Sequence, residues 1–128
     1  YAALVHDRAQ LKMFANRYAG LPVRNAGTLG GNVANGSPIG DSLPALIALS
    51  ATVTLRSASG TRTMPLEDYF IDYGKQDRAP GELVWRIDVP KLKGNEVFRA
   101  YKISKRFDQD ISAVLGCFDI QTQNGLIT

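Results

Sequence analysis

The stretch "RNAGTLGGNVANGSPIGDSLPALIAL", residues 24–49, decides how this chain is interpreted. Glycines and small polar residues crowd its beginning, and an apolar run closes it. Gly30 and Gly31 are adjacent, so the backbone there can reach positive φ angles and another group can approach without meeting a Cβ. Thr28 adds a hydroxyl and Asn32 adds an amide. The stretch is open to three interpretations: turns in a compact domain, a phosphate or nucleotide site, or a contact surface for another chain.

One predicted helix precedes this stretch and another forms its end. Apolar residues recur at helical intervals over residues 7–18, which predicts an amphipathic helix. Residues 21–23 are expected to be extended, because the residue before Pro22 avoids helical geometry. A second helix is predicted over residues 43–49, with Asp41 or Ser42 as its cap.

From residue 52 onward the apolar pattern changes to a period of two, which indicates strands. The sequence Gln123-Asn124-Gly125 is typical of a hairpin turn. The predicted fold is α+β, an antiparallel sheet with flanking helices. The predicted strands are residues 52–57, 61–66, 83–89, 97–103 and 112–122, with one helical turn at 67–70.

Composition excludes several classes of function. The hydrophobic fraction of 45% is ordinary for a globular protein, and no apolar run approaches the roughly 18 residues of a membrane span. The net charge of +3 is too mild, and its basic clusters too sparse, for a nucleic-acid binder. With one histidine and with Cys117 as the one cysteine, the sequence predicts no metal site and no catalytic residue. We expect a cytoplasmic protein.

Three blocks of the sequence resemble the FAD-binding flavoproteins of the molybdenum hydroxylases, the family of xanthine dehydrogenase and of the carbon monoxide dehydrogenase medium subunit. The first is the T-L-G-G-N core at 28–32 with S-P-I-G-D at 37–41. The others are "GELVWRIDVP" at 81–90 and "FRAYKISKRFDQDISAV" at 98–114. The resemblance implies that residues 1–92 are the second lobe of the FAD-binding domain and that residues 93–128 begin the family's C-terminal flavoprotein domain, itself α+β.

The resemblance also assigns cofactor contacts. It implies that the FAD diphosphate meets the T-L-G-G-N core, that an aspartate hydrogen-bonds FAD, and that a lysine lies close to the flavin ring. The positions that match are Tyr18, Val23, Thr28, Gly30, Gly31, Asn32, Asp41, Leu83, Val84 and Lys102.

The residues alone leave other roles open at several of these positions. Tyr18 lies on the apolar side of the first predicted helix and fits a core, whereas Lys102 fits a solvent-facing residue. Asp41 as a helix cap is about as probable as Asp41 as a ligand. Leu83 and Val84 point to opposite faces of one strand, so at most one meets a flavin ring unless the strand bulges. Trp85 belongs to the core or to a subunit contact.

The resemblance implies an oxidoreductase component that passes electrons from iron–sulfur clusters through FAD to NAD⁺ or another acceptor. Its partners would be a molybdenum-cofactor subunit and an iron–sulfur domain, in a hetero-oligomer. Two alternatives are a cofactor-free module that docks a subunit and a nucleotide- or anion-binding domain unrelated to flavin. The family's first FAD-binding lobe has no counterpart in these 128 residues. We therefore expect the fragment alone to be inactive and to bind FAD weakly or not at all, since association costs are not halved with the contacts.

Overall fold

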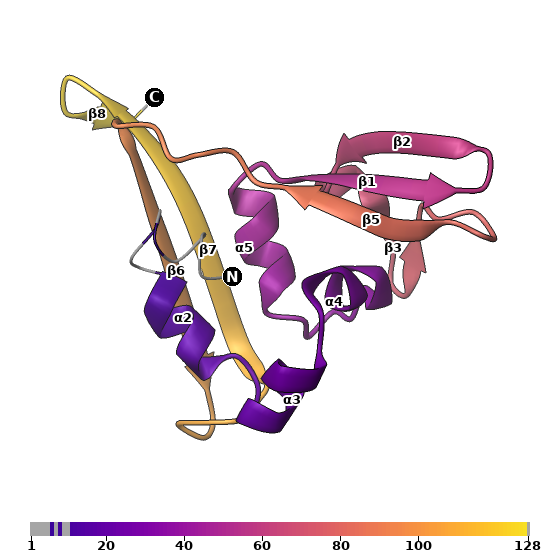
Figure 1. Cartoon of the computed structure of the whole chain (residues 1–128). Helices are drawn as coiled ribbons and strands as arrows, with labels where there is room; N and C mark the ends of the chain where they lie inside the picture. Colours follow the sequence, from indigo (N-terminus) through magenta and orange to yellow (C-terminus); the bar gives the residue numbers. More distant parts are fainter. Residues whose placement is uncertain (1–5, 7, 9–10, 128) are drawn as a thin grey trace. The chain divides into compact units, whose positions relative to one another are not determined.

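The structure is a computed structural model that describes residues 6, 8 and 11–127 of the 128. The chain forms two compact units, which are described separately (Figure 1). One unit is Ala26–Pro90, and the two-segment unit combines Tyr1–Asn25 with Lys91–Thr128. Every strand pairing among the described residues is antiparallel, and the helices are short. The α+β class is therefore confirmed, whereas the division into residues 1–92 and 93–128 stays a prediction.

The Ala26–Pro90 unit places two helices ahead of a small sheet of strand order β2-β1-β5. The hairpin predicted over residues 52–66, the helical turn predicted at 67–70 and the strand predicted at 83–89 are all present. A short hairpin, β3 with β4, was not predicted within the polar loop. The elements are α4 Leu29–Asn35, α5 Ser42–Ala48, β1 Thr52–Ser57, β2 Gly60–Pro65, η1 Glu67–Tyr69, β3 Phe70–Asp72, β4 Lys75–Gln76 and β5 Leu83–Asp88.

One apolar cluster holds this unit together. Val33 comes from α4, Leu46 from α5, and Val53 and Leu55 from β1, and none of the four is more than 4% exposed. Burying a side chain of this size contributes about 1.5–3 kcal/mol. The cluster explains why the short helix α4 forms, since helices of a few turns depend on tertiary packing.

Strand β5 contains a bulge that the sequence pattern did not predict. Leu55 of β1 pairs with Val84, but the preceding residue, Thr54, pairs with Arg86, so the register skips Trp85. A bulge sends two successive side chains to similar sides and then resumes alternation. Val84 and Ile87 accordingly pack on the core cluster, whereas Trp85 is 49% exposed. The interpretation of Trp85 as a core residue is therefore wrong.

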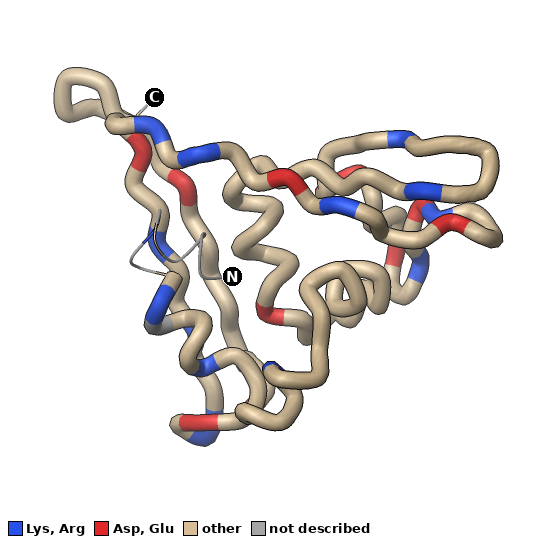
Figure 2. The backbone as a smooth tube through the Cα atoms, in the orientation of Figure 1, with Lys and Arg blue, Asp and Glu red and all other residues tan. Residues whose placement is uncertain are grey.

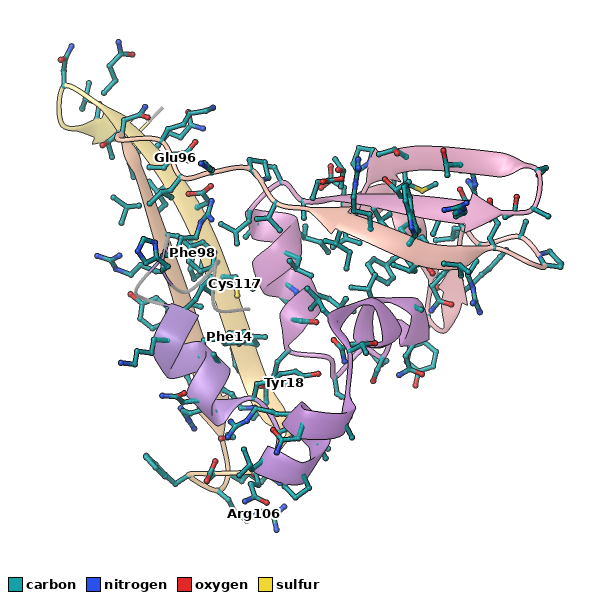
Figure 3. The ribbon with its side chains drawn as sticks, in the orientation of Figure 1. Phe14, Tyr18, Glu96, Phe98, Arg106 and Cys117 are labelled. Carbon is teal, nitrogen blue, oxygen red and sulfur yellow. The ribbon has the colours of Figure 1, made fainter. Side chains whose placement is uncertain are left out.

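The two-segment unit consists of a long two-stranded ribbon, two helices and a short final strand. Helix α2 contacts β6, and Phe14 of α2 and Phe98 of β6 are both buried (Figure 3). Asn124 and Gly125 both have positive φ in the turn between β7 and β8, which confirms the predicted hairpin turn. The elements are α2 Leu11–Arg17, α3 Leu21–Ala26, β6 Glu96–Ser104, β7 Ser112–Gln123 and β8 Leu126–Ile127.

The extended conformation predicted for residues 21–23 is wrong, because α3 begins at Leu21. Pro22 lies in the first turn of α3, where its missing N–H costs nothing. The guanidinium of Arg24 then donates hydrogen bonds to the carbonyls of Ala15, Asn16 and Tyr18, at 3.3, 2.7 and 3.2 Å. Arg24 thus provides hydrogen-bond donors for the backbone carbonyls at the C-terminal end of α2 and fixes α3 beside that helix. The first residues of the predicted 7–18 helix lie partly outside the described residues.

No helix in the described part of the chain is long and apolar enough to cross a membrane. Figure 2 shows basic and acidic segments interspersed along the Ala26–Pro90 unit, without a long run of either sign.

Candidate functional site

The T-L-G-G-N core forms the first turn of α4 rather than an irregular loop. Thr28 is the N-cap residue, and its Oγ1 accepts a hydrogen bond of 3.0 Å from the Gly31 amide. The Asn32 amide donates to the Thr28 carbonyl at 3.0 Å. Gly30 and Gly31 are helical and are not among the glycines with positive φ. The positive φ angles that glycine permits are not used here, because the Thr28 cap and packing on the core cluster favour a helix.

A Cβ added at Gly30 and a Cβ added at Gly31 would meet different surroundings. A Cβ on Gly30 would lie 3.7 Å from the Val84 carbonyl oxygen and 3.8 Å from Val84 Cγ1, which is ordinary contact. Gly30 therefore faces β5 closely. A Cβ on Gly31 would lie only 2.9 Å from Thr28 Oγ1, so the capping hydroxyl would have to shift. Gly31 itself is exposed, so this part of the α4 backbone is open to a ligand.

Asn32 is oriented by a residue that the sequence analysis did not assign to the site. Ser42 Oγ, at the start of α5, donates a hydrogen bond to Asn32 Oδ1. With Oδ1 engaged, the Nδ2 amino group of Asn32 is left as the donor of that side chain. The expectation that Asp41 or Ser42 begins a helix was the only signal for this contact.

Asp41 is buried at the N-cap position of α5, with 6% of its surface exposed. Its carboxylate makes no capping hydrogen bond to that helix. The interpretation of Asp41 as an ordinary helix cap is therefore wrong, and a ligand role is not in competition with a cap.

On β5, only one of the two predicted residues faces α4. Val84 is half-buried against the core cluster and lies beside Gly30. Leu83 pairs with Arg56, is 53% exposed and points to the opposite face. The bulge follows Val84 and does not bring Leu83 to the same side, so the two residues do not face one ligand group together.

The loop that leads into β5 is held by an ion-pair network. Arg62 on β2 donates to Glu82 at 2.7 Å and to Asp77 at 2.8 Å, and the Ala79 amide donates to Glu82 at 2.7 Å. The hydrogen bond from Arg62, followed by that from Ala79, lowers the pKa of Glu82 to about 2. This network fixes the entry to β5 and so supports the position of Val84.

The other three predicted site residues, Tyr18, Val23 and Lys102, belong to the two-segment unit. Tyr18 follows α2 and is half-buried, and Val23 lies on α3 with 58% of its surface exposed. Lys102 is half-buried on β6 opposite Leu115, and its carbonyl accepts a 3.0 Å hydrogen bond from Arg17. Sequence reasoning did not identify Arg17 as the residue that anchors this strand.

The structure thus brings Thr28, Gly30, Gly31, Asn32 and Val84 together at one end of α4, with Asp41 at the start of the next helix. Their roles toward a cofactor stay predictions. Among the described residues, no three potential metal-ligating side chains come together.

Residues 2–92 match the family model described as the FAD binding domain in molybdopterin dehydrogenase. This match includes all of the Ala26–Pro90 unit. It also includes the part of the chain that carries Tyr18 and Val23, whereas Lys102 lies beyond it.

Two similar proteins agree with that match. The chain is 40% identical over 110 residues to xanthine dehydrogenase from Blastobotrys adeninivorans, covering 84% of this chain and 8% of the relative. It is 36% identical over 112 residues to the glyceraldehyde dehydrogenase medium chain from Sulfolobus acidocaldarius, covering 87% of this chain and 40% of the relative. The chain therefore spans only a minor part of these relatives.

The fold also matches a solved structure, the carbon monoxide dehydrogenase from Hydrogenophaga pseudoflava. The TM-score is 0.89 at 25% sequence identity, over 98% of this chain and 44% of the solved chain.

Proposed function

The chain belongs to the family of FAD-binding domains of molybdopterin dehydrogenases, and from this premise we propose that the start of α4 binds the diphosphate of FAD in a xanthine dehydrogenase-like oxidoreductase. The observation that supports the proposal most is the family match over residues 2–92, because it contains the exposed glycine backbone and its polar neighbours.

The residues at the start of α4 fit a diphosphate. Thr28 Oγ1 accepts from the Gly31 amide, which leaves the hydroxyl hydrogen to donate to a phosphate oxygen. Ser42 holds Asn32 so that the Nδ2 group is a second donor. Between them, Gly31 presents no side chain, so a phosphate could approach the backbone closely.

The remaining contacts are proposed with the same family as support. Asp41 would accept a hydrogen bond from the cofactor, and Val84 would supply the apolar contact from β5 because it lies on the α4 side. Lys102 would place a cation near the flavin ring, where it stabilises negative charge on the reduced form. Tyr18 and Val23 are proposed as cofactor contacts on the family resemblance alone.

When bound, FAD supplies the capacity to accept and release electrons, and the protein supplies orientation and electrostatics. We propose that these electrons come from molybdenum and iron–sulfur centres on partner domains or subunits and leave to NAD⁺ or another acceptor. The medium-chain relative from Sulfolobus supports a hetero-oligomeric setting. A cytoplasmic location is proposed on the same footing.

The proposal is tested by the flavin content of the intact protein that contains this chain. Gly31→Val should abolish retention of the visible flavin absorption, because the new side chain occupies the approach to the backbone and displaces Thr28 Oγ1. The control is Gly94→Ala, at a glycine with no atom within 4 Å of the added Cβ and no positive φ. Unchanged flavin content in a folded Gly31→Val protein would show that this turn does not bind the cofactor.

A further inference from the structure

A second feature of the Ala26–Pro90 unit lies on the face of the sheet that points away from the core cluster. Two arginines lie over the Trp85 ring there, with Arg56 Cζ 5.2 Å and Arg86 Cζ 5.7 Å from the ring centre. The indole is 49% exposed, and Leu83 beside it is 53% exposed. We call Arg56, Trp85 and Arg86 the arginine–tryptophan cluster.

The bulge in β5 creates this cluster. In a regular strand, Trp85 and Arg86 would point to opposite faces. Because the register skips Trp85, Arg86 pairs with Thr54 and Ile87 with Val53, whose side chain is fully buried in the core. Trp85 and Arg86 are therefore both exposed, on the side away from Ile87. The same irregularity keeps Val84 on the α4 side of the strand.

The cluster carries two positive charges, and only that of Arg86 has a carboxylate partner among the described residues. Arg86 forms a 2.8 Å ion pair with Asp88. Arg56 contacts the Trp85 ring and has no carboxylate partner in the described part of the chain. Stacking uses the flat face of a guanidinium and leaves its N–H edge available for a bidentate bond to a carboxylate.

We propose that the arginine–tryptophan cluster docks an acidic segment of a partner protein, with a partner carboxylate bound to the edge of Arg56 and a partner apolar side chain packed on Trp85. Tryptophan and arginine dominate the energetics of protein interfaces, where an apolar surface beside a charged edge gives both affinity and orientation. The unpaired positive charge selects an acidic partner. The inference rests on this sheet face and not on flavin binding.

The identity of the occupant is tested by photo-crosslinking in the intact complex purified from cells. Trp85 is replaced by p-benzoylphenylalanine, and the control carries the same group in place of Tyr73, an aromatic residue of the same unit that is 84% exposed. We expect a light-dependent adduct from position 85 with a different protein, at a peptide that contains Asp or Glu beside an apolar residue, and no such adduct from position 73; an adduct with another domain of the same polypeptide overturns the proposal. An adduct only with a second copy of this chain, or none, overturns the proposal.

The charge requirement is tested by the variant Arg56→Glu in the same complex. Its matched control is Lys75→Glu, which makes the same charge change at an exposed residue of the unit. We expect Arg56→Glu to weaken assembly by roughly thirtyfold, the loss typical of an interface hot spot, and Lys75→Glu to change it little. Arg56→Lys should lie between, since it keeps the charge and loses the fork.

Flavin content separates this inference from the proposed function. Arg56→Glu should retain flavin in the partner-free protein, because Arg56 lies on the opposite face of the sheet from the Gly30 and Val84 contact. Equal assembly of the Arg56→Glu and Lys75→Glu variants would overturn the docking proposal, whatever the flavin result.

Discussion

Replacing Gly31 with alanine tests whether the Thr28 cap is what requires a glycine at this position. In a helix interior, alanine is favoured over glycine by about 0.8–1 kcal/mol. At Gly31 the added Cβ lies 2.9 Å from Thr28 Oγ1, so the hydroxyl must shift and its hydrogen bond to the amide of residue 31 weakens, at most to complete loss. Loss of such a cap costs about 0.5–2 kcal/mol. The two effects nearly cancel, and we expect Gly31→Ala to change the free energy of unfolding by less than about 1 kcal/mol.

The effect becomes clear when the cap is removed first. Thr28→Ala alone should destabilise the unit by about 1 kcal/mol. With Thr28 already absent, Gly31→Ala meets no hydroxyl and should stabilise by the full helix preference of about 0.8–1 kcal/mol. The double-mutant cycle should therefore give a coupling energy of about 1 kcal/mol between the two positions.

Gly30→Ala is the matched control in the same turn. Its Cβ would lie at ordinary contact distances from Val84 and meet no capping atom, so it should stabilise similarly with and without Thr28. Urea unfolding followed by the fluorescence of Trp85, the only tryptophan of these 128 residues, reports on this unit. If Gly31→Ala stabilises equally in both backgrounds, the capping explanation for Gly31 is refuted.

Three further predictions concern side chains outside this turn. Tyr69→Phe should raise the free energy of unfolding in urea by about 1 kcal/mol, because the Tyr69 hydroxyl is buried without a hydrogen-bond partner among the described residues. The pKa of Glu82 is lowered to about 2, so its ion pair with Arg62 contributes stability above pH 4.5 that is lost as the pH falls toward 2. Glu82→Gln should flatten the pH dependence of the unfolding midpoint in this range. Arg17→Lys should lower the free energy of unfolding of the two-segment unit by about 1–2 kcal/mol, measured by calorimetry. The lysine side chain lacks the forked guanidinium that donates hydrogen bonds to the Lys102 and Phe107 carbonyls.

Local patterns predicted the elements whose conformation depends on near neighbours. The β1–β2 hairpin, the helical turn at Glu67–Tyr69 and the Asn124-Gly125 turn all formed where alternation and turn residues placed them. The three blocks that resemble the FAD-binding flavoproteins also identified the family, which the match over residues 2–92 confirms. A single sequence predicts a feature well when the residues that form it are consecutive.

Contacts between separate helices and strands decided the rest. Helix α3 forms where an extended segment was expected, because the Arg24 guanidinium binds three carbonyls at the end of α2. The Gly30-Gly31 pair is helical because α4 packs Val33 into the core and lies against β5.

The sequence by itself determined the α+β class and the strand periodicity, which follow from the spacing of apolar residues, and the family, which follows from the resemblance of three blocks. Only the tertiary structure decided which face each side chain of β5 occupies. The alternation of Leu83, Trp85 and Ile87 suggested one shared face, but pairing with β1 inserts a bulge that buries Ile87 and exposes Trp85. Strand register depends on the partner strand as well as on the strand itself, so the register cannot be predicted from the apolar pattern of one strand.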